Sequence, residues 1–407
     1  MPSWTPVTLS AVVISDGHQR KRRTSHTDVD GECMLEATRL PRWIPMARYP
    51  GRQNETRIPL EVLRESVARI FRACGMLADA AQTVTDSLVE ADLRGIHSHG
   101  VLRVPDYVAK LTREGVNPKG VPRIVKEFGA VLVVDCDNNM GQVGMSFAMD
   151  ACIERAAIHG IAFAAVRGSN HAGTMEYYAR RAAARNMVGV CATNALPTMA
   201  PLGGTDKLVG INPIGIALPG AQAGDFVLDI AFGATAHGKI RVYAQKNEPI
   251  PEGWALDIHG EATTDATAAL EGLIAPIGAH KGVGLGMAMG MLSSLLSGAA
   301  YGTESGNMVD GPKPGVDGHF TMAINIEAFT EVKTFRERVD NVLNEIRTSG
   351  RSRGVQRLLT PGEIEENLEH EQREHGITLN EQTLNDIVRG GQEVGADLNT
   401  LQVILNG

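Results

Sequence analysis

The chain contains the stretch Ser98-His99-Gly100-Val101-Leu102-Arg103-Val104-Pro105-Asp106-Tyr107, which sets three polar side chains four residues apart. Residues four apart share one face of a helix, so His99, Arg103 and Tyr107 are predicted to form one stripe. Proline lacks an amide hydrogen and is tolerated only near a helix start or at a kink, so Pro105 predicts a helix that begins after His99. A proton donor beside a carboxylate-binding guanidinium is what a reductase of 2-oxo acids requires.

A solvated helix face is the alternative for each of these side chains taken singly. Arg94 and His97 precede the triple. So dense a group of acid/base and cationic side chains favours a functional cluster over a solvated face.

Length and composition favour a soluble globular protein with a small-molecule ligand. A chain of 407 residues with 43% hydrophobic and 21% charged residues can bury a sizeable core, and its length predicts two or three domains. The net charge is −8, and the body of the chain has no basic run interleaved with aromatic residues. A nucleic-acid groove is therefore not favoured.

The five cysteines stand singly: Cys33, Cys74, Cys136, Cys152 and Cys191. An odd number of scattered cysteines without a Cys-x-x-Cys pair argues for a reducing compartment and against structural zinc, so no metal is expected. Apolar runs such as Gly286 to Leu296 are too short to cross a bilayer, and the basic residues at 20–23 are not followed by an apolar core of signal-peptide length. We therefore expect a cytoplasmic protein that does not bind a membrane.

Helical periodicity marks both ends of the chain. Residues 1–55 lack periodicity and are predicted to be a disordered extension, a leader or an over-long start. Three helices are predicted next: one from Pro59 that stops at Gly75, one from an N-cap at Asp79 to Leu93, and one from Val101 to Glu114. The tail is predicted to be helical over Thr334–Arg347 and Thr360–Leu405.

The middle of the chain alternates between strand-like and helix-like segments. Strands are predicted at Ala130–Asp135, Ile161–Val166 and Val188–Thr193, and helices at Ser146–His159 and Thr174–Asn186. A mixed α/β (α+β) fold follows. Residues 126–326 are expected to form an α/β domain inserted into a helical domain built from residues 56–125 and 327–407.

Two nucleotide-binding motifs are matched only in part. The run Gly233 to Lys239 has the Walker spacing, but Ile240 stands where the magnesium-binding Ser or Thr is required. The run Gly282 to Gly290 is rich in glycine, yet its spacing is not GxGxxG and no acidic residue some twenty positions on completes a βαβ unit. A standard Rossmann fingerprint is therefore absent.

A second candidate segment is Gly168-Ser169-Asn170-His171-Ala172-Gly173, between a predicted strand and a predicted helix. The partial positive charge of a helix N-terminus favours the neutral imidazole, which suits a group that takes and returns a proton. The alternative is that His171 satisfies local turn amides.

Four further polar residues follow apolar runs or lie beside glycine. Asn194 and Asn212 stand at strand ends that lead into turns, and turn chemistry alone accounts for either of them. Asp229 could accept a hydrogen bond from a ribose hydroxyl or cap a helix. Lys281 precedes Gly282 at the start of a glycine-rich run, where a cation and backbone amides could hold phosphate, although a surface lysine is the alternative.

Taken in order, these motifs resemble the malate/L-lactate dehydrogenase family of the second type. The motifs that carry the resemblance over roughly residues 57–407 are Ser98-His99-Gly100 with Arg103 and Tyr107, Asn170-His171-Ala172-Gly173, Gly203-Gly204, Asn212-Pro213, Asp229-Ile230-Ala231, Gly253-Trp254-Ala255, Gly260 with Thr264-Asp265, Lys281-Gly282 and Pro361-Gly362-Glu363. The family includes ureidoglycolate and sulfolactate dehydrogenases, diketogulonate reductase and cyclic-imine reductases.

The resemblance implies a non-Rossmann nicotinamide-binding fold, usually in a homodimer, and a set of site residues. It implies that His99 or His171 supplies the proton, that Ser98, Arg103 and Tyr107 hold the substrate, and that Asn194 lies near it. It also implies that Asp229, Ile230, Ala231, Lys281, Gly282, Pro361, Gly362 and Glu363 lie along NAD or NADP. Many relatives have an aromatic residue where this chain has Ala172, a difference that we expect to reshape the pocket.

The resemblance thus implies an oxidoreductase that transfers a hydride between NAD(P) and a small 2-hydroxy or 2-oxo acid. Reduction of a cyclic 2-imino acid is the alternative within the family. A catalytically silent ligand-binding protein is the alternative from another class, and the presence of His99, Arg103, His171 and Lys281 argues against it.

Overall fold

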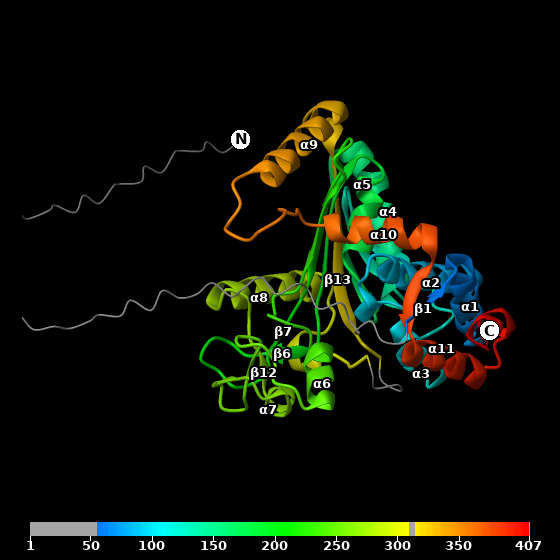
Figure 1. Ribbon diagram of the computed structural model, residues 1–407. Helices are drawn as coiled ribbons and strands as arrows, with labels where there is room; N and C mark the ends of the chain where they lie inside the picture. Colours follow the sequence, from blue (N-terminus) through cyan, green and yellow to red (C-terminus); the bar gives the residue numbers. More distant parts are fainter. Residues whose placement is uncertain (1–54, 309–313, 407) are drawn as a thin grey trace, which may run out of the picture. The chain divides into compact units, whose positions relative to one another are not determined.

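The computed structural model describes residues 55–308 and 314–406 (Figure 1). The predicted extension at residues 1–55 therefore lies outside the described residues except for Glu55, which begins the first strand. No helix in these two ranges is long and apolar enough to cross a membrane.

A seven-stranded mixed sheet forms the centre, in the order β2-β3-β4-β13-β5-β8-β9. Its strands are β2 (Arg123–Phe128), β3 (Val131–Asp135), β4 (Ile161–Ser169), β13 (Asp317–Asn325), β5 (Met187–Thr193), β8 (Ile214–Leu218) and β9 (Phe226–Ile230). Only β3 and β4 pair in parallel, and the other neighbours are antiparallel. A Rossmann sheet is parallel throughout its core, so the predicted mixed, non-Rossmann α/β fold is confirmed.

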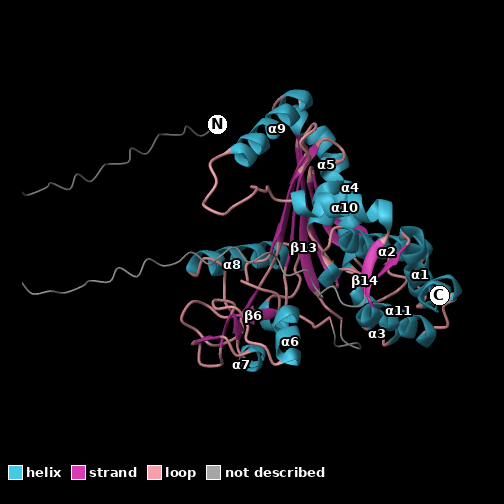
Figure 2. Cartoon of the chain, viewed as in Figure 1, coloured by secondary structure: helices cyan, strands magenta, loops and turns pink. Residues whose placement is uncertain are grey.

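Helices cover both faces of this sheet (Figures 1 and 2). On one face lie α4 (Gly141–His159) and α5 (Glu176–Ala183), and on the other lies α8 (His280–Leu295). Apolar side chains of α4, α5 and the inner strands form one buried cluster, which includes Met149 and Ala323. Because β13 lies between β4 and β5 with helices on both faces, its residues from Gly318 to Thr321 are buried.

Segments from the two ends of the chain share a second core. Its helices are α1 (Leu60–Ala73), α2 (Ala78–Leu93), α3 (Val104–Thr112), α11 (Glu381–Glu393) and α12 (Asn399–Asn406), and α10 (Glu363–His375) packs against α2. Strand β1 (Glu55–Ile58) pairs antiparallel with β14 (Ile377–Asn380), so the start of the described chain is hydrogen-bonded to its last hundred residues. The division of the chain into domains at 125/126 and 326/327 stays a prediction.

The remaining elements are short. Strands β6 (Pro197–Met199) and β7 (Val209–Gly210) pair with each other, and β10 (Ala255–Leu256), β11 (Ala262–Thr263) and β12 (Leu273–Ile274) form a small sheet. They pack with α6 (His237–Lys246) and α7 (Ala266–Glu271) around a third cluster that contains Phe232 and Ile240. Helix α9 (Val332–Thr348) and four single 3₁₀ turns, η1 (His97–His99), η2 (Val101–Arg103), η3 (Gly302–Glu304) and η4 (Ile326–Ala328), complete the described part.

Two predicted helix starts are wrong. Helix α2 has Leu77 at its N-cap, and Asp79 lies in the first turn, where its charge favours the helix dipole without capping. The helix predicted over Val101–Glu114 is α3, which begins at Val104 and ends at Thr112. Since Pro105 lies in the first turn of α3, the preceding residues form the 3₁₀ turns instead.

Other boundaries move because of tertiary contacts. Helix α4 begins at Gly141, before the predicted Ser146, and its first residue lies so close to the Asn170 loop that a Cβ there would be 2.2 Å from Asn170 O. Strand β4 continues to Ser169 because it pairs with β13, and α5 spans only Glu176–Ala183 of the predicted Thr174–Asn186. The tail predicted to be helical over Thr360–Leu405 forms three helices, interrupted by β14.

Candidate active site

His99 and His171 come together from two distant parts of the chain. His99 ends the 3₁₀ turn η1, and His171 lies in the loop between β4 and α5. Their rings stack with centroids 5.6 Å apart and planes inclined by 18°. The two candidate proton donors therefore form one site.

Asp92, near the end of α2, holds the segment that carries His99. Its Oδ1 lies 2.7 Å from His97 Nδ1, and its Oδ2 accepts a hydrogen bond of 2.7 Å from the backbone amide of Val101. The two bonds bracket Ser98, whose hydroxyl lies 2.9 Å from His99 Nδ1. Burial opposes a charge on His97, but the hydrogen bond and charge of Asp92 outweigh it and raise the pKa of His97.

A chain of hydrogen bonds fixes His171. The Tyr107 hydroxyl, which is fully buried, lies 2.7 Å from His171 Nδ1. The Gln142 side-chain amide, in the first turn of α4, donates to the Tyr107 oxygen at 2.8 Å. The backbone amide of Gly173 also points at His171 Nδ1, at 3.4 Å.

Both histidines are held neutral. Burial, followed by the positive charge of Arg103, lowers the pKa of His99 to about 4. Burial, followed by His99 and Arg103, holds the pKa of His171 well below its usual value. At neutral pH the site therefore offers two uncharged imidazoles beside a fixed cation, an arrangement that can take a proton from a hydroxyl group.

Hydrogen bonds to its neighbours orient Arg103 but do not occupy its whole guanidinium group. Its Nε donates to Ser98 O at 2.8 Å, and its Nη1 lies 3.2 Å from Asp106 Oδ2. Among the described residues, its Nη2 has no hydrogen-bond partner, and the side chain is 23% exposed. His99, Arg103 and Tyr107 are gathered as predicted, although on two 3₁₀ turns and α3 rather than along one helix.

Asn194, predicted near the substrate, is used inside the fold. Its amide nitrogen donates to Ser294 Oγ at 3.0 Å and to Ala300 O at 2.8 Å, and its oxygen accepts from the Gly318 amide at 3.1 Å. These bonds join the end of β5 to α8 and β13. No hydrogen bond in the described part of the chain connects Asn194 with either histidine.

Asp229, predicted on the cofactor, holds the segment after His171. Its Oδ2 accepts hydrogen bonds from the backbone amides of Met175 at 2.7 Å and Glu176 at 3.0 Å, where α5 begins. Burial raises the pKa of Asp229 to about 7. Its Oδ1 has no bond to another described residue, and Ile230 and Ala231 beside it are half-buried.

Lys281 and Gly282 lie in the first turn of α8. The Lys281 side chain is exposed and makes no hydrogen bond or ion pair with the described residues. A Cβ at Gly282 would lie 2.0 Å from Ile277 O, so the close approach of these two backbones requires glycine there. The predicted pair thus combines a free cation with a packing requirement.

The segment Pro361-Gly362-Glu363 lies against the edge of the central sheet. Pro361 O accepts a hydrogen bond of 3.3 Å from Val227 of β9, and Gly362 has φ of +89° with no room for a Cβ against Val227. Glu363 pairs with Arg347 at 2.8 Å and with Arg357. These contacts dock the start of α10 on the sheet.

Sequence reasoning missed Gln142 and Asp92. A glutamine in the first turn of a helix and an aspartate near the end of another give no local signal, because their partners lie far away in the sequence. Ala172 is only 2% exposed and belongs to the core cluster with α4, and its effect on the shape of the pocket stays a prediction.

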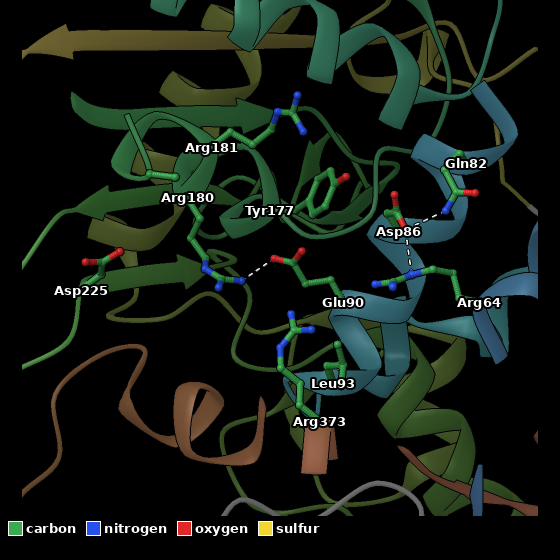
Figure 3. A pocket seen from close by; sticks show the side chains of 11 residues that line it. Arg64, Gln82, Asp86, Glu90, Leu93, Tyr177, Arg180, Arg181, Asp225 and Arg373 are labelled. Atoms are coloured by element: carbon green, nitrogen blue, oxygen red, sulfur yellow. Dashed lines mark hydrogen bonds and ion pairs between the residues drawn. The ribbon is translucent and has the colours of Figure 1, made fainter. Parts of the chain in front are cut away.

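An open hollow of about 560 Å³ lies apart from these residues, between α2, α5 and α10 (Figure 3). Its lining includes four arginines: Arg64, Arg180, Arg181 and Arg373. In Figure 3 Arg180 points at Glu90 and Arg64 at Asp86, and Arg181 and Arg373 pair with Asp150 and Glu369, whose side chains the figure does not draw. Because each guanidinium already has an acidic partner, the hollow offers no free cation to an anionic ligand.

Known proteins share this fold and much of this sequence. The model of the malate/L-lactate dehydrogenase family matches residues 58–388. The L-sulfolactate dehydrogenase of Methanocaldococcus jannaschii is 37% identical over 346 residues, which cover 85% of this chain and 97% of that protein. The malate dehydrogenase of Pyrococcus abyssi is 37% identical over 319 residues, covering 76% of this chain and 87% of that one.

Solved structures of related proteins have the same fold. The sulfolactate dehydrogenase from Methanocaldococcus jannaschii superposes with a TM-score of 0.80 at 36% identity, covering 85% of this chain and 99% of that one. The delta1-piperideine-2-carboxylate reductase from Pseudomonas syringae superposes with a TM-score of 0.75 at 25% identity, covering 82% and 99%.

Proposed function

The chain belongs to the malate/L-lactate dehydrogenase family, and we propose that it interconverts a small 2-hydroxy acid and the matching 2-oxo acid with NAD or NADP. The observation that carries this proposal is the stacked, neutral pair His99 and His171 beside Arg103. A neutral base and a fixed cation are the two groups that oxidation of a hydroxy acid needs from a protein.

Each residue of the site has a role in this proposal. Arg103 binds the substrate carboxylate, using Nη2, the guanidinium nitrogen without a hydrogen-bond partner among the described residues. His171, whose Nδ1 lies against the Tyr107 hydroxyl, is the first candidate for exchanging a proton with the substrate oxygen. His99 is the rival for this step, and Ser98 orients it through the hydrogen bond to Nδ1.

Substrate binding also makes the reverse reaction accessible. The charge of Arg103 is one cause of the low pKa of both histidines. A bound carboxylate offsets that charge, so the proton needed to reduce an oxo acid is held more firmly once the acid has bound.

The chain's residues fit a nicotinamide dinucleotide. Lys281 is a free cation in the first turn of a helix of 16 residues, a place that suits a phosphate group. Asp229 keeps one carboxylate oxygen free for a ribose hydroxyl, next to Ile230 and Ala231. When bound, the nicotinamide exchanges a hydride with the substrate carbon that bears the oxygen.

The remaining proposals concern the assembly and its compartment. The resemblance supports a homodimer. The described cysteines, Cys74, Cys136, Cys152 and Cys191, are all free thiols, which supports a reducing compartment such as the cytoplasm.

A cofactor-oxidation screen tests the function. Purified protein is mixed with NADH or NADPH and with a panel of 2-oxo acids and cyclic 2-imino acids, the second class being prompted by the reductase relative. We expect turnover with at least one 2-oxo acid. Turnover with imines alone would establish the alternative activity, and cofactor binding without turnover of either class would contradict both.

Replacing His171 or His99 with Ala assigns the proton donor. The true donor's variant should lose turnover by about 10²–10⁴-fold, the usual contribution of a general acid or base, with cofactor affinity retained. Near-normal turnover of both variants would refute the mechanism.

A further inference from the structure

Gln142 is not among the predicted substrate or cofactor residues, yet it is the last member of the hydrogen-bond chain behind His171. Its side chain is fully buried, and its Nε2 donates to the Tyr107 oxygen at 2.8 Å. Its Oε1 is buried as well and has no partner among the described residues. A buried acceptor without a partner costs free energy, so its retention calls for an explanation.

The hydrogen-bond donors around His171 determine which ring nitrogen carries the proton when His171 is neutral. The Gly173 backbone N–H can only donate, and it points at Nδ1. Nδ1 is therefore an acceptor, and the Tyr107 hydroxyl donates to it. The Tyr107 oxygen is then free to accept from Gln142, and the proton of His171 stands on Nε2.

Protonation of His171 at Nδ1 reverses the donor and acceptor roles along the hydrogen-bond chain. Once Nδ1 carries a proton it donates to the Tyr107 oxygen, and the Tyr107 O–H must find another acceptor. Tyr107 is fully buried, so water does not supply one easily. A half-turn of the Gln142 amide brings Oε1, now without a partner, to the place of Nε2.

We propose that Gln142 is a positioning residue that lets His171 pass between its neutral and protonated forms, by donating to Tyr107 in one form and accepting from it in the other. The inference rests on the proposed function for its kinetic consequence, although the proton positions do not depend on it. A primary amide is the one neutral side-chain group with a donor and an acceptor related by such a half-turn.

Other charged and titratable groups face the hydrogen-bond chain and also affect the protonation of His171 and Tyr107. His99 and Arg103 on the 3₁₀ turns and His319 on β13 oppose a proton on His171. Asp106 on α3 and Asp317 on β13 face Tyr107 and disfavour tyrosinate. None of these groups exchanges donor for acceptor with the Tyr107 hydroxyl, so substitutions at Gln142 isolate that exchange.

The test follows the ring nitrogens of His171 by ¹⁵N NMR in the full-length protein from pH 4 to 9, with no substrate. In the unsubstituted protein we expect a neutral ring protonated on Nε2 at neutral pH. Gln142→Glu supplies an acceptor in place of the donor, so we expect the protonation constant of His171 to rise by about 10- to 1000-fold, as for an opposite charge nearby. Ser146→Ala, one turn further along α4 at another buried site, is the matched control and should leave the titration unchanged.

Kinetics and a double variant complete the test. Gln142→Met removes donor and acceptor while keeping volume, and we expect it to lower turnover about 10- to 100-fold in both reaction directions, since both pass through the same partly protonated imidazole. In a Tyr107→Phe background the same substitution should have no further effect.

Three results would overturn the proposal: a neutral His171 protonated on Nδ1, a folded Gln142→Glu protein with an unchanged His171 titration, or Gln142→Met effects that persist without the Tyr107 hydroxyl. Because the NMR readout needs no substrate, it stands even if no 2-oxo acid is turned over. Failure of the substrate screen alone would refute the proposed function and leave the proton positions as measured.

Discussion

Gly100→Ala is the substitution for which the structure gives the sharpest expectation. Gly100 has φ of −89° and ψ of −154°, a backbone conformation that alanine can adopt, so the backbone itself adds no strain. A Cβ there would lie 2.2 Å from Asp92 Oδ1 and 2.3 Å from both Cγ and Oδ2. The Asp92 carboxylate, which is 1% exposed, must therefore move by about an ångström to reach ordinary contact distance.

The cost of that movement has two parts. Overpacking a filled interior costs about 1–3 kcal/mol. The shifted carboxylate also weakens its bonds to His97 Nδ1 and the Val101 amide, each 2.7 Å long, and hydrogen bonds to charged groups are worth about 1.5–3 kcal/mol each. If one of the two is lost, the free energy of unfolding falls by about 2.5–6 kcal/mol in total. Turnover should fall with it, because these bonds position His99.

The assay is denaturant unfolding combined with turnover measured well below the unfolding midpoint. Gly238→Ala is the control, because a Cβ at this glycine in α6 meets nothing within 4 Å, and alanine in a helix should leave stability equal or raise it by up to about 1 kcal/mol. A Gly100→Ala protein that unfolds within about 0.5 kcal/mol of the unsubstituted protein and keeps its turnover would refute the view that Asp92 anchors this segment.

Two further predictions concern Arg103 and Glu369. Arg103→Ala should raise KM for the acid about 30-fold to several-thousand-fold with unchanged cofactor affinity. Arg103→Lys should restore only part of the loss, because lysine does not reproduce the paired guanidinium bonds. An equal loss of activity with uncharged carbonyl analogues would instead show that Arg103 supports the fold. Burial opposes ionisation of Glu369, but its arginine partners, Arg180 first, outweigh it and lower its pKa to about 2 from 4.5. A lowered pKa stabilises the folded protein above pH 4.5, and this stabilisation is lost as the pH falls towards 2. Glu369→Gln should therefore be less stable than the unsubstituted protein at pH 7. The difference in free energy of unfolding between the two proteins should narrow by about 2 kcal/mol between pH 4.5 and 2 in acid unfolding curves. A gap that does not change over this range would show that Glu369 is not held ionised by these partners.

The sequence predicted elements whose signal is local. Helix α1 was expected from Pro59, and Pro59 is its N-cap; strands β3 and β5 also lie within a residue of their predicted bounds. Strands β1 and β14 were not predicted, because each has four residues and is defined only by its partner at the other end of the chain. A strand of that length has no periodicity of its own to detect.

In the candidate site, too, the sequence predicted the features whose signal is local. The spacing of His99, Arg103 and Tyr107 predicted their proximity, since all three lie within one short segment. The stacking of His99 on His171 depends on packing between segments far apart in the sequence, so the sequence named both histidines as candidates without predicting their contact. Gln142 enters only through the hydroxyl of Tyr107, so no pattern in the sequence around it indicates its role.

The two histidine-bearing segments are anchored by the same device. Asp92 holds the His99 segment through Val101, and Asp229 holds the start of α5, just after the His171 loop, through Met175 and Glu176.

These two anchors are joined directly. Arg94, two residues beyond Asp92, pairs with Glu176, the residue whose amide Asp229 binds, and both side chains are at least 96% buried. Arg94 also reaches Glu369 of α10 at 2.9 Å, so the end of the chain braces the same junction. A buried ion pair adds little net stability over an apolar contact, but it tolerates little change in geometry. Charged groups outside the site therefore help to set the position of one histidine relative to the other, and a highly charged network lies beside the neutral pair His99 and His171.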